Sequence, residues 1–149
     1  MAKEIERKFL VKGEFRHLAR EIKEITQAYL VIDHDKTIRI RISDKEAFLT
    51  IKGRPAPNSF GRDEWEVSVP LADAEEMMGI CLPGKIVKTR YKIPSGNHII
   101  EVDVFHDKNE GLVIAEIELA SEEEDYIKPD WLGEEVTGNP AYYNANLKK

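Results

Sequence analysis

Charged side chains recur at every second position in several segments of this sequence. In the opening stretch, EIERKF, the side chains of Glu4, Glu6 and Lys8 share one face of a predicted strand, because successive strand residues point to opposite faces. In the stretch TIRIRIS, Arg39 and Arg41 share a face opposite three isoleucines. Like charges held two residues apart repel one another, so each of these faces needs either water or a counter-charge.

Five later segments repeat this pattern. Their charged faces carry Lys52; Arg62, Glu64 and Glu66; Lys88 and Arg90; Glu101 and Asp103; and Glu116 and Glu118. One interpretation is an ordinary antiparallel sheet with one face in water. Solvent-exposed faces usually mix polar residues and scatter the signs of their charges, whereas here like charges occur in pairs. The whole set therefore favours charged faces that meet inside a closed structure.

A closed barrel would bring the first and last strands together, so that four carboxylates converge: Glu4, Glu6, Glu116 and Glu118. Such a cluster is typical of a site for a hard divalent cation, or of carboxylates with raised pKa values. Ligation by oxygen alone favours Mg²⁺ or Mn²⁺. The same lumen would hold arginines, whose planar guanidinium groups bind phosphate oxygens in pairs. The residues thus predict a site for a metal-bound polyphosphate.

These side chains must be positioned by a sheet, because period-two alternation extends over most of the chain. We predict eight strands, over residues 3–11, 25–32, 37–43, 46–53, 62–69, 85–93, 98–105 and 112–119. We predict peripheral helices over 14–22, 72–80 and 141–149, and a loop over 54–61. The predicted fold class is mainly β (α+β): an eight-stranded antiparallel closed β-barrel with a few peripheral helices, in a single domain over 1–149.

Composition narrows the classes of function. The 149 residues carry 28 acidic against 22 basic side chains, and the net charge of −6 speaks against a nucleic-acid partner. Cys81 is the only cysteine, which excludes an intramolecular disulfide and a cysteine-rich zinc site, and fits a reducing compartment. No apolar run approaches the length of a membrane span. We therefore expect a soluble, cytoplasmic protein without a membrane partner.

The ordered set of charged motifs resembles the CYTH superfamily, also called the triphosphate tunnel metalloenzymes. EIERKF matches the family's ExExK signature, and the later motifs follow in the family's order: RIR at 39–41, TIK at 50–52, EWE at 64–66, KTRY at 88–91, EVD at 101–103 and EIE at 116–118. An ExExK motif alone is common among charged strands. The ordered set, which spans residues 3–119, is specific.

The resemblance implies a tunnel in which divalent metal and basic residues bind a triphosphate. The metal ligands that it implies are Glu4, Glu6, Glu64, Glu66, Asp103, Glu116 and Glu118. The triphosphate contacts that it implies are Lys8, Arg39, Arg41, Lys52, Lys88 and Arg90, with Lys8, Glu6 and Glu118 as the catalytic group. Asp103 is open to a second reading, in which it fixes neighbouring cations.

The leading functional prediction is a metal-dependent hydrolase that cleaves inorganic tripolyphosphate to pyrophosphate and phosphate. A nucleoside or thiamine triphosphatase and an adenylate cyclase are alternatives within the same fold. The motifs indicate how the triphosphate group is bound but not which group is attached to its far end. A non-catalytic polyphosphate-binding module is the alternative from another class. Acidic residues in the lumen favour catalysis, because they oppose an anionic ligand unless metal intervenes. The sequence leaves the oligomeric state open.

Overall fold

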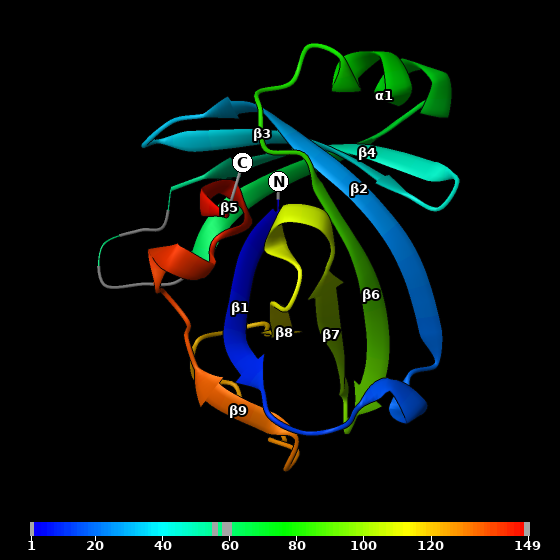
Figure 1. The fold of residues 1–149 in the computed structure, drawn as a ribbon. Coiled ribbons are helices and arrows are strands. Elements are labelled where there is room, and N and C mark those ends of the chain that lie inside the picture. Colours follow the sequence, from blue (N-terminus) through cyan, green and yellow to red (C-terminus); the bar gives the residue numbers. More distant parts are fainter. Residues whose placement is uncertain (1, 55–56, 58–60, 148–149) are drawn as a thin grey trace.

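The computed structural model describes residues 2–54, 57 and 61–147, and within them it is dominated by strands (Figure 1). The strands are β1 (Ala2–Val11), β2 (Glu21–Ile32), β3 (Lys36–Ser43), β4 (Glu46–Gly53), β5 (Gly61–Val69), β6 (Ile86–Ser95), β7 (His98–Phe105), β8 (Val113–Glu118) and β9 (Leu132–Glu135). One α-helix, α1 (Leu71–Met78), occurs in the described part of the chain. Four 3-10 turns complete the elements: η1 (Arg16–Leu18), η2 (Asp107–Asn109), η3 (Pro140–Tyr142) and η4 (Asn144–Asn146).

The first eight strands form a closed antiparallel barrel, as the sequence predicts. Strand order is β5-β4-β3-β2-β6-β7-β8-β1-β9, and an additional β5–β1 pairing closes the ring. β1 achieves this closure by changing partner along its length: residues 2–5 pair with β5, and residues 6–10 pair with β8. Strands that are far apart in the sequence therefore become neighbours in space.

Apolar side chains lie mainly on the outside of the barrel wall and are covered by other elements. On one side Ile40 and Ala47 are buried beneath Ala74 of α1, which lies over β3 and β4 (Figure 1). On another side a cluster around Phe9 and Ile100 is covered by the segment that contains β9. Because strand side chains alternate, this arrangement turns the charged faces into the lumen.

Three differences from the sequence-based prediction concern peripheral elements. The helix predicted over 14–22 is wrong: η1 is a single turn, and β2 already begins at Glu21 because residues 21–23 pair with residues 90–92 of β6. The described part of the helix predicted over 141–149 consists of 3-10 turns, and its last two residues lie outside the described chain. β9 was not predicted, since its four residues, LGEE, are too few to show alternation.

The remaining peripheral predictions are one helix and one loop. α1 corresponds to the helix predicted over 72–80. Most of the loop predicted over 54–61 lies outside the described residues, namely 55–56 and 58–60. No helix in the described part of the chain is both long and apolar enough to cross a bilayer.

Candidate functional site

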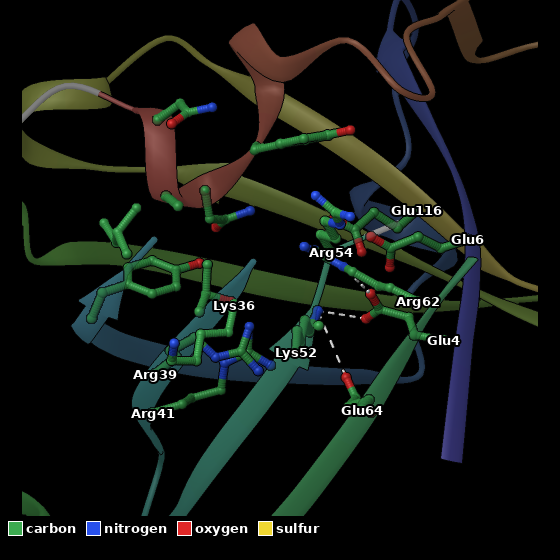
Figure 2. Close-up of a pocket in the computed structure, with 18 of the residues that line it drawn as sticks. Glu4, Glu6, Lys36, Arg39, Arg41, Lys52, Arg54, Arg62, Glu64 and Glu116 are labelled. Carbon is green, nitrogen blue, oxygen red and sulfur yellow. Dashed lines mark hydrogen bonds and ion pairs between the residues drawn. The ribbon is translucent and has the colours of Figure 1, made fainter. Parts of the chain in front are cut away.

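A cavity of about 250 Å³ lies inside the barrel and is lined by all eight barrel strands, seven of which contribute charged side chains while β2 contributes Tyr29 and Ile32 (Figure 2). Eleven of the predicted site residues line it: Glu4, Glu6, Lys8, Arg39, Arg41, Lys52, Glu64, Lys88, Arg90, Glu116 and Glu118. The two signs of charge are partly separated. Figure 2 shows Arg39 and Arg41 on one side and Glu4, Glu6 and Glu116 on the other, where Lys52 and Arg62 lie among the acids.

On the acidic side, Glu4 is held between two cations. Its carboxylate forms ion pairs with Lys52 and, at 3.2 Å, with the Nε atom of Arg62. Burial opposes ionisation here, but the two cations prevail and lower the pKa of Glu4. Arg62 faces the cavity by the same alternation as Glu64, as its place on the charged face of the predicted strand indicates.

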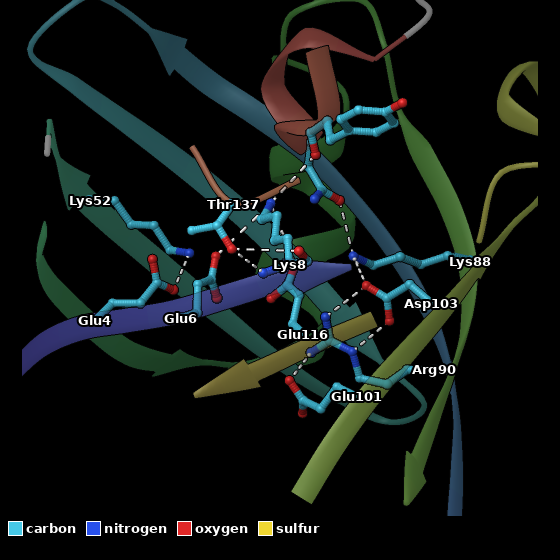
Figure 3. Close-up of polar contacts among 12 residues, drawn as sticks. Glu4, Glu6, Lys8, Lys52, Lys88, Arg90, Glu101, Asp103, Glu116 and Thr137 are labelled. Atoms are coloured by element: carbon cyan, nitrogen blue, oxygen red, sulfur yellow. Dashed lines mark hydrogen bonds and ion pairs between the residues drawn. The ribbon is translucent and has the colours of Figure 1, made fainter. Parts of the chain in front are cut away.

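Glu6 and Glu116 form a coupled carboxyl pair beside Lys8 (Figure 3). The β1–β8 register places Lys8 opposite Glu116, and the Lys8 Nζ atom lies 3.5 Å from Glu116 Oε1 and 3.9 Å from Glu6 Oε1. Burial and repulsion from Glu116 and Glu4 raise the pKa of Glu6 well above its usual range. In Glu116, Lys8 and a hydrogen bond from Glu6 overcome burial and lower the pKa. The two neighbouring carboxyl groups therefore have pKa values shifted in opposite directions.

The remaining acids of this side are Glu64 and Glu118. Burial, together with repulsion from Glu4, raises the pKa of both carboxyl groups. Among the described residues, a group of three acids or histidines with ligand atoms within 4.8 Å of one another occurs in the exposed turn Asp33–Asp35, outside the predicted ligand set. The lumen acids thus share one cavity but are separated into smaller groups by Lys8, Lys52 and Arg62.

On the basic side, Arg39 and Arg41 point into the cavity from β3. An Arg39 Nη2–H donates to Thr50 Oγ1 at 3.2 Å, and the Arg41 Nε–H donates to Gln27 Oε1 at 2.8 Å. Neither arginine forms an ion pair with a carboxylate of the described chain, and the buried Nε atom of Arg39 has no partner there. Burial, with repulsion from Arg39 and Arg90, lowers the pKa of Arg41 to about 9. The surplus of positive charge suits an anionic ligand.

A buried ion cluster supports this basic side from behind. Asp103 accepts two hydrogen bonds from Arg90, at 2.8 and 2.9 Å, and its Oδ2 atom lies 2.7 Å from the Lys88 Nζ atom (Figure 3). Burial opposes ionisation of Asp103, but Arg90 and Lys88 hold its pKa well below the usual range. Burial lowers the pKa of Lys88 to about 7; repulsion from Arg90 and Arg41 adds to this effect, and Asp103 counteracts it.

Two predicted metal ligands are placed differently from the rest. Asp103 lies behind the cavity wall with its carboxylate engaged by Arg90 and Lys88, which agrees with the reading that it fixes neighbouring cations. Glu66 is exposed, accepts a hydrogen bond from Thr50 Oγ1 at 2.8 Å, and lines a separate pocket of about 400 Å³.

Sequence reasoning gave no role to the C-terminal residues Tyr143 and Asn144, which line the cavity, or to the buried Gln27, which accepts a hydrogen bond from Arg41. Alternation along β2 could have indicated Gln27, since it shares a face with Tyr29. The C-terminal pair lies in 3-10 turns without any periodic signal.

Comparison with known proteins agrees with this geometry. The model of the CYTH domain matches residues 2–146. The chain belongs to the CYTH family. A CYTH relative from Acetivibrio thermocellus, named inorganic triphosphatase, is 43% identical over 151 residues, covering 100% of this chain and 95% of the relative. A second inorganic triphosphatase, from Nitrosomonas europaea, is 34% identical and covers 97% and 95% of the two chains.

A solved CYTH structure has the same fold. The crystal structure of an inorganic triphosphatase matches with a TM-score of 0.68 at 30% identity, over 96% of this chain and 95% of that chain. This likeness confirms the closed barrel and places the charged lumen inside a known CYTH tunnel architecture.

The ion cluster around Asp103 makes a prediction for stability. Asp103→Asn leaves Arg90 and Lys88 buried without their counter-charge, so it should lower the free energy of unfolding by about 3 kcal/mol at pH 7. Because folding lowers the pKa of Asp103, this contribution is full above the unfolded value and is lost as the pH falls through the folded value. Urea unfolding should therefore show the difference shrinking below about pH 4.

The matched control is Asp125→Asn, which changes an exposed carboxylate and should shift the free energy of unfolding by less than about 0.5 kcal/mol at every pH. A difference between the parent and Asp103→Asn that stays constant down to pH 3 would show that the carboxylate charge is not the source of stability.

Proposed function

We propose that this CYTH protein hydrolyses inorganic triphosphate to pyrophosphate and phosphate with the help of a divalent cation. The observation that carries the proposal is the division of the lumen. Arg39 and Arg41 lack carboxylate partners among the described residues and face the same cavity as the acids of β1 and β8. Full-length relatives at 43% and 34% identity that are named inorganic triphosphatase support the same reaction.

The acidic side of the lumen fits a hard divalent cation. Its donors are carboxylate oxygens alone, and mutual repulsion together with burial raises the pKa of Glu6, Glu64 and Glu118. We assign Mg²⁺ or Mn²⁺ to five ligand candidates: Glu4, Glu6, Glu64, Glu116 and Glu118. Such a cation would offset the charge of the triphosphate and make a bound water more acidic. We give Glu66 and Asp103 other roles, because Glu66 lies outside this cavity and Asp103 is engaged by cations.

Basic side chains from both sides of the lumen provide the triphosphate contacts. We assign phosphate binding to six side chains: Lys8, Arg39, Arg41, Lys52, Lys88 and Arg90. Asp103 positions Arg90 and Lys88, while Thr50 orients Arg39. Hydrolysis adds water to one terminal phosphorus and breaks one P–O–P bond, and guanidinium groups stabilise the negative charge that develops on the leaving pyrophosphate. Lys8 lies beside Glu6 and Glu116 and lines the cavity, which suits contact with the reacting phosphoryl group near Glu6 and Glu118.

Two broader proposals accompany this function. We propose that residues 1–149 act as a single CYTH-like domain, since the family match covers 2–146. We also propose a cytoplasmic location, which is consistent with a single, partly buried cysteine at position 81.

Release of orthophosphate from three substrates tests the proposed reaction. Tripolyphosphate, ATP and thiamine triphosphate would be compared at equal concentrations with Mg²⁺ and with Mn²⁺, and the products identified. We expect fastest release from tripolyphosphate and none in a chelator. Faster release from ATP would indicate a nucleoside triphosphatase, and cyclic AMP among the products would indicate a cyclase. Tight binding of tripolyphosphate without turnover would support a binding module instead.

Arg39 and its neighbour Ile40 test the assignment of the lumen face. Arg39→Ala should raise the KM for tripolyphosphate by about 30-fold or more, as for loss of a buried charge contact worth ~2 kcal/mol. Ile40 is fully buried beneath α1, so Ile40→Val should cost about 1 kcal/mol of stability and leave KM unchanged. Steady-state kinetics and urea unfolding measure both effects. Equal kinetic losses in the two variants would contradict the assignment.

Glu6 and Glu118 test the shared cation. They are paired in the β1–β8 register, so Glu6→Gln and Glu118→Gln should each raise the Mn²⁺ concentration needed for half-maximal activity and lower kcat by orders of magnitude. The double variant should lose much less than the sum of the two, because both act through one ion. Melting in chelator should show no loss of stability, since each change removes a repelling charge. Strictly additive losses would exclude a shared ion.

A further inference from the structure

The C-terminal segment forms part of the cavity wall, although it lies outside the barrel strands. Asn144 in η4 lines the cavity, and its Oδ1 atom accepts hydrogen bonds from the Lys88 Nζ atom at 3.0 Å and from the Gln27 Nε2 atom at 3.1 Å. Lys88 lies on β6 and Gln27 on β2, and these two strands are paired. A neutral amide thus lies directly among the cations proposed to bind triphosphate.

The orientation of this amide follows from a chain of fixed donors. Arg41 can only donate, so the Gln27 oxygen must face it, and the Gln27 Nε2 group must then face Asn144. The Asn144 side chain must therefore accept this hydrogen bond with its Oδ1 atom. Its Nδ2 group is left with two N–H donors, and within the described chain no protein acceptor receives them. Gln27 is fully buried, so this orientation is held rigidly.

Both flanks of Asn144 are anchored to the barrel. On the upstream side, β9 pairs with β1, the Thr137 Oγ1 atom accepts from the Lys8 backbone N–H at 2.9 Å, and the Tyr142 carbonyl accepts from Lys8 Nζ at 3.4 Å. On the downstream side, Leu147 is buried in an apolar cluster with Ile86. Because the segment is fixed at both ends, it is suited to form a constant part of the cavity wall rather than a plug that the substrate must displace.

We infer that Asn144 is a further substrate-binding residue, which donates its Nδ2 hydrogens to a phosphate oxygen of the triphosphate. The inference rests on the proposed function of the lumen. A neutral donor contributes a directed hydrogen bond without increasing the repulsion that already lowers the pKa of its neighbours Lys88 and Arg41. Arg41, through Gln27, positions the amide for this contact.

Asn144→Asp separates the donor from the rest of the side chain. It retains the shape and the oxygen that Lys88 and Gln27 reach, but replaces the NH₂ group by a second oxygen and adds a negative charge, so Asn144→Ala is the uncharged counterpart that removes the donor without changing the charge balance. We expect the KM for tripolyphosphate to rise about tenfold or more in Asn144→Asp and in Asn144→Ala, as for a lost hydrogen bond to a charged group, with a smaller change in kcat. The rise in melting temperature caused by tripolyphosphate with Mn²⁺ should shrink in parallel.

The control is Asn139→Ala in the same segment, whose side chain accepts from the Ala141 N–H and does not line the cavity. It should leave KM at the parent value. An unchanged KM in Asn144→Ala, or an equal rise of KM in Asn139→Ala, would overturn the inference. A gain in kcat/KM in Asn144→Ala would also overturn it, because it would indicate a segment that competes with substrate. If the parent binds tripolyphosphate but does not hydrolyse it, the proposed function fails, and the melting shifts still decide the role of Asn144.

Discussion

Compensation of buried charge governs this structure. The barrel turns its charged faces inward, where the desolvation of an ionised group without a partner is unfavourable. Each cluster of charged groups offsets this desolvation in a different way. Asp103 forms ion pairs with Lys88 and Arg90, Glu4 forms ion pairs with Lys52 and Arg62, and burial beside Glu116 raises the pKa of Glu6. Arg39 and Arg41 are compensated only by neutral oxygens within the described chain. Because the buried charges are incompletely compensated, the lumen is suited to bind an anion on one side and a cation on the other.

The outward-facing core follows from the same constraint. Because the lumen is occupied by charged groups, the apolar face of each strand must be covered from outside, by α1 over β3 and β4 and by the β9 segment over the opposite wall. The peripheral elements outside the barrel strands therefore bury much of the apolar surface whose burial stabilises the barrel.

Sequence alternation predicted most of the side chains that face the lumen, although Glu66 and Asp103 do not line the cavity. Arg39 and Ile40, adjacent in the chain, end up in the cavity and beneath α1 respectively, because a strand leaves no other choice once one face is buried. The residues that alternation missed lie where no period exists, as with Asn144 in its 3-10 turn. The predicted helix over 14–22 failed for a different reason: pairing with β6 extends β2 back to Glu21, and such tertiary pairing overrides local preference.

The pairing of β1 has a consequence for biosynthesis. Its hydrogen-bond partners are β5, β8 and β9, so β1 has no strand partner until residues 61–64 have been synthesised, and its carboxylates meet those of β8 only after residue 118. Contacts so distant along the chain slow folding. A chain that ended before β8 would lack Glu116 and Glu118 and would leave an open sheet edge, which promotes aggregation.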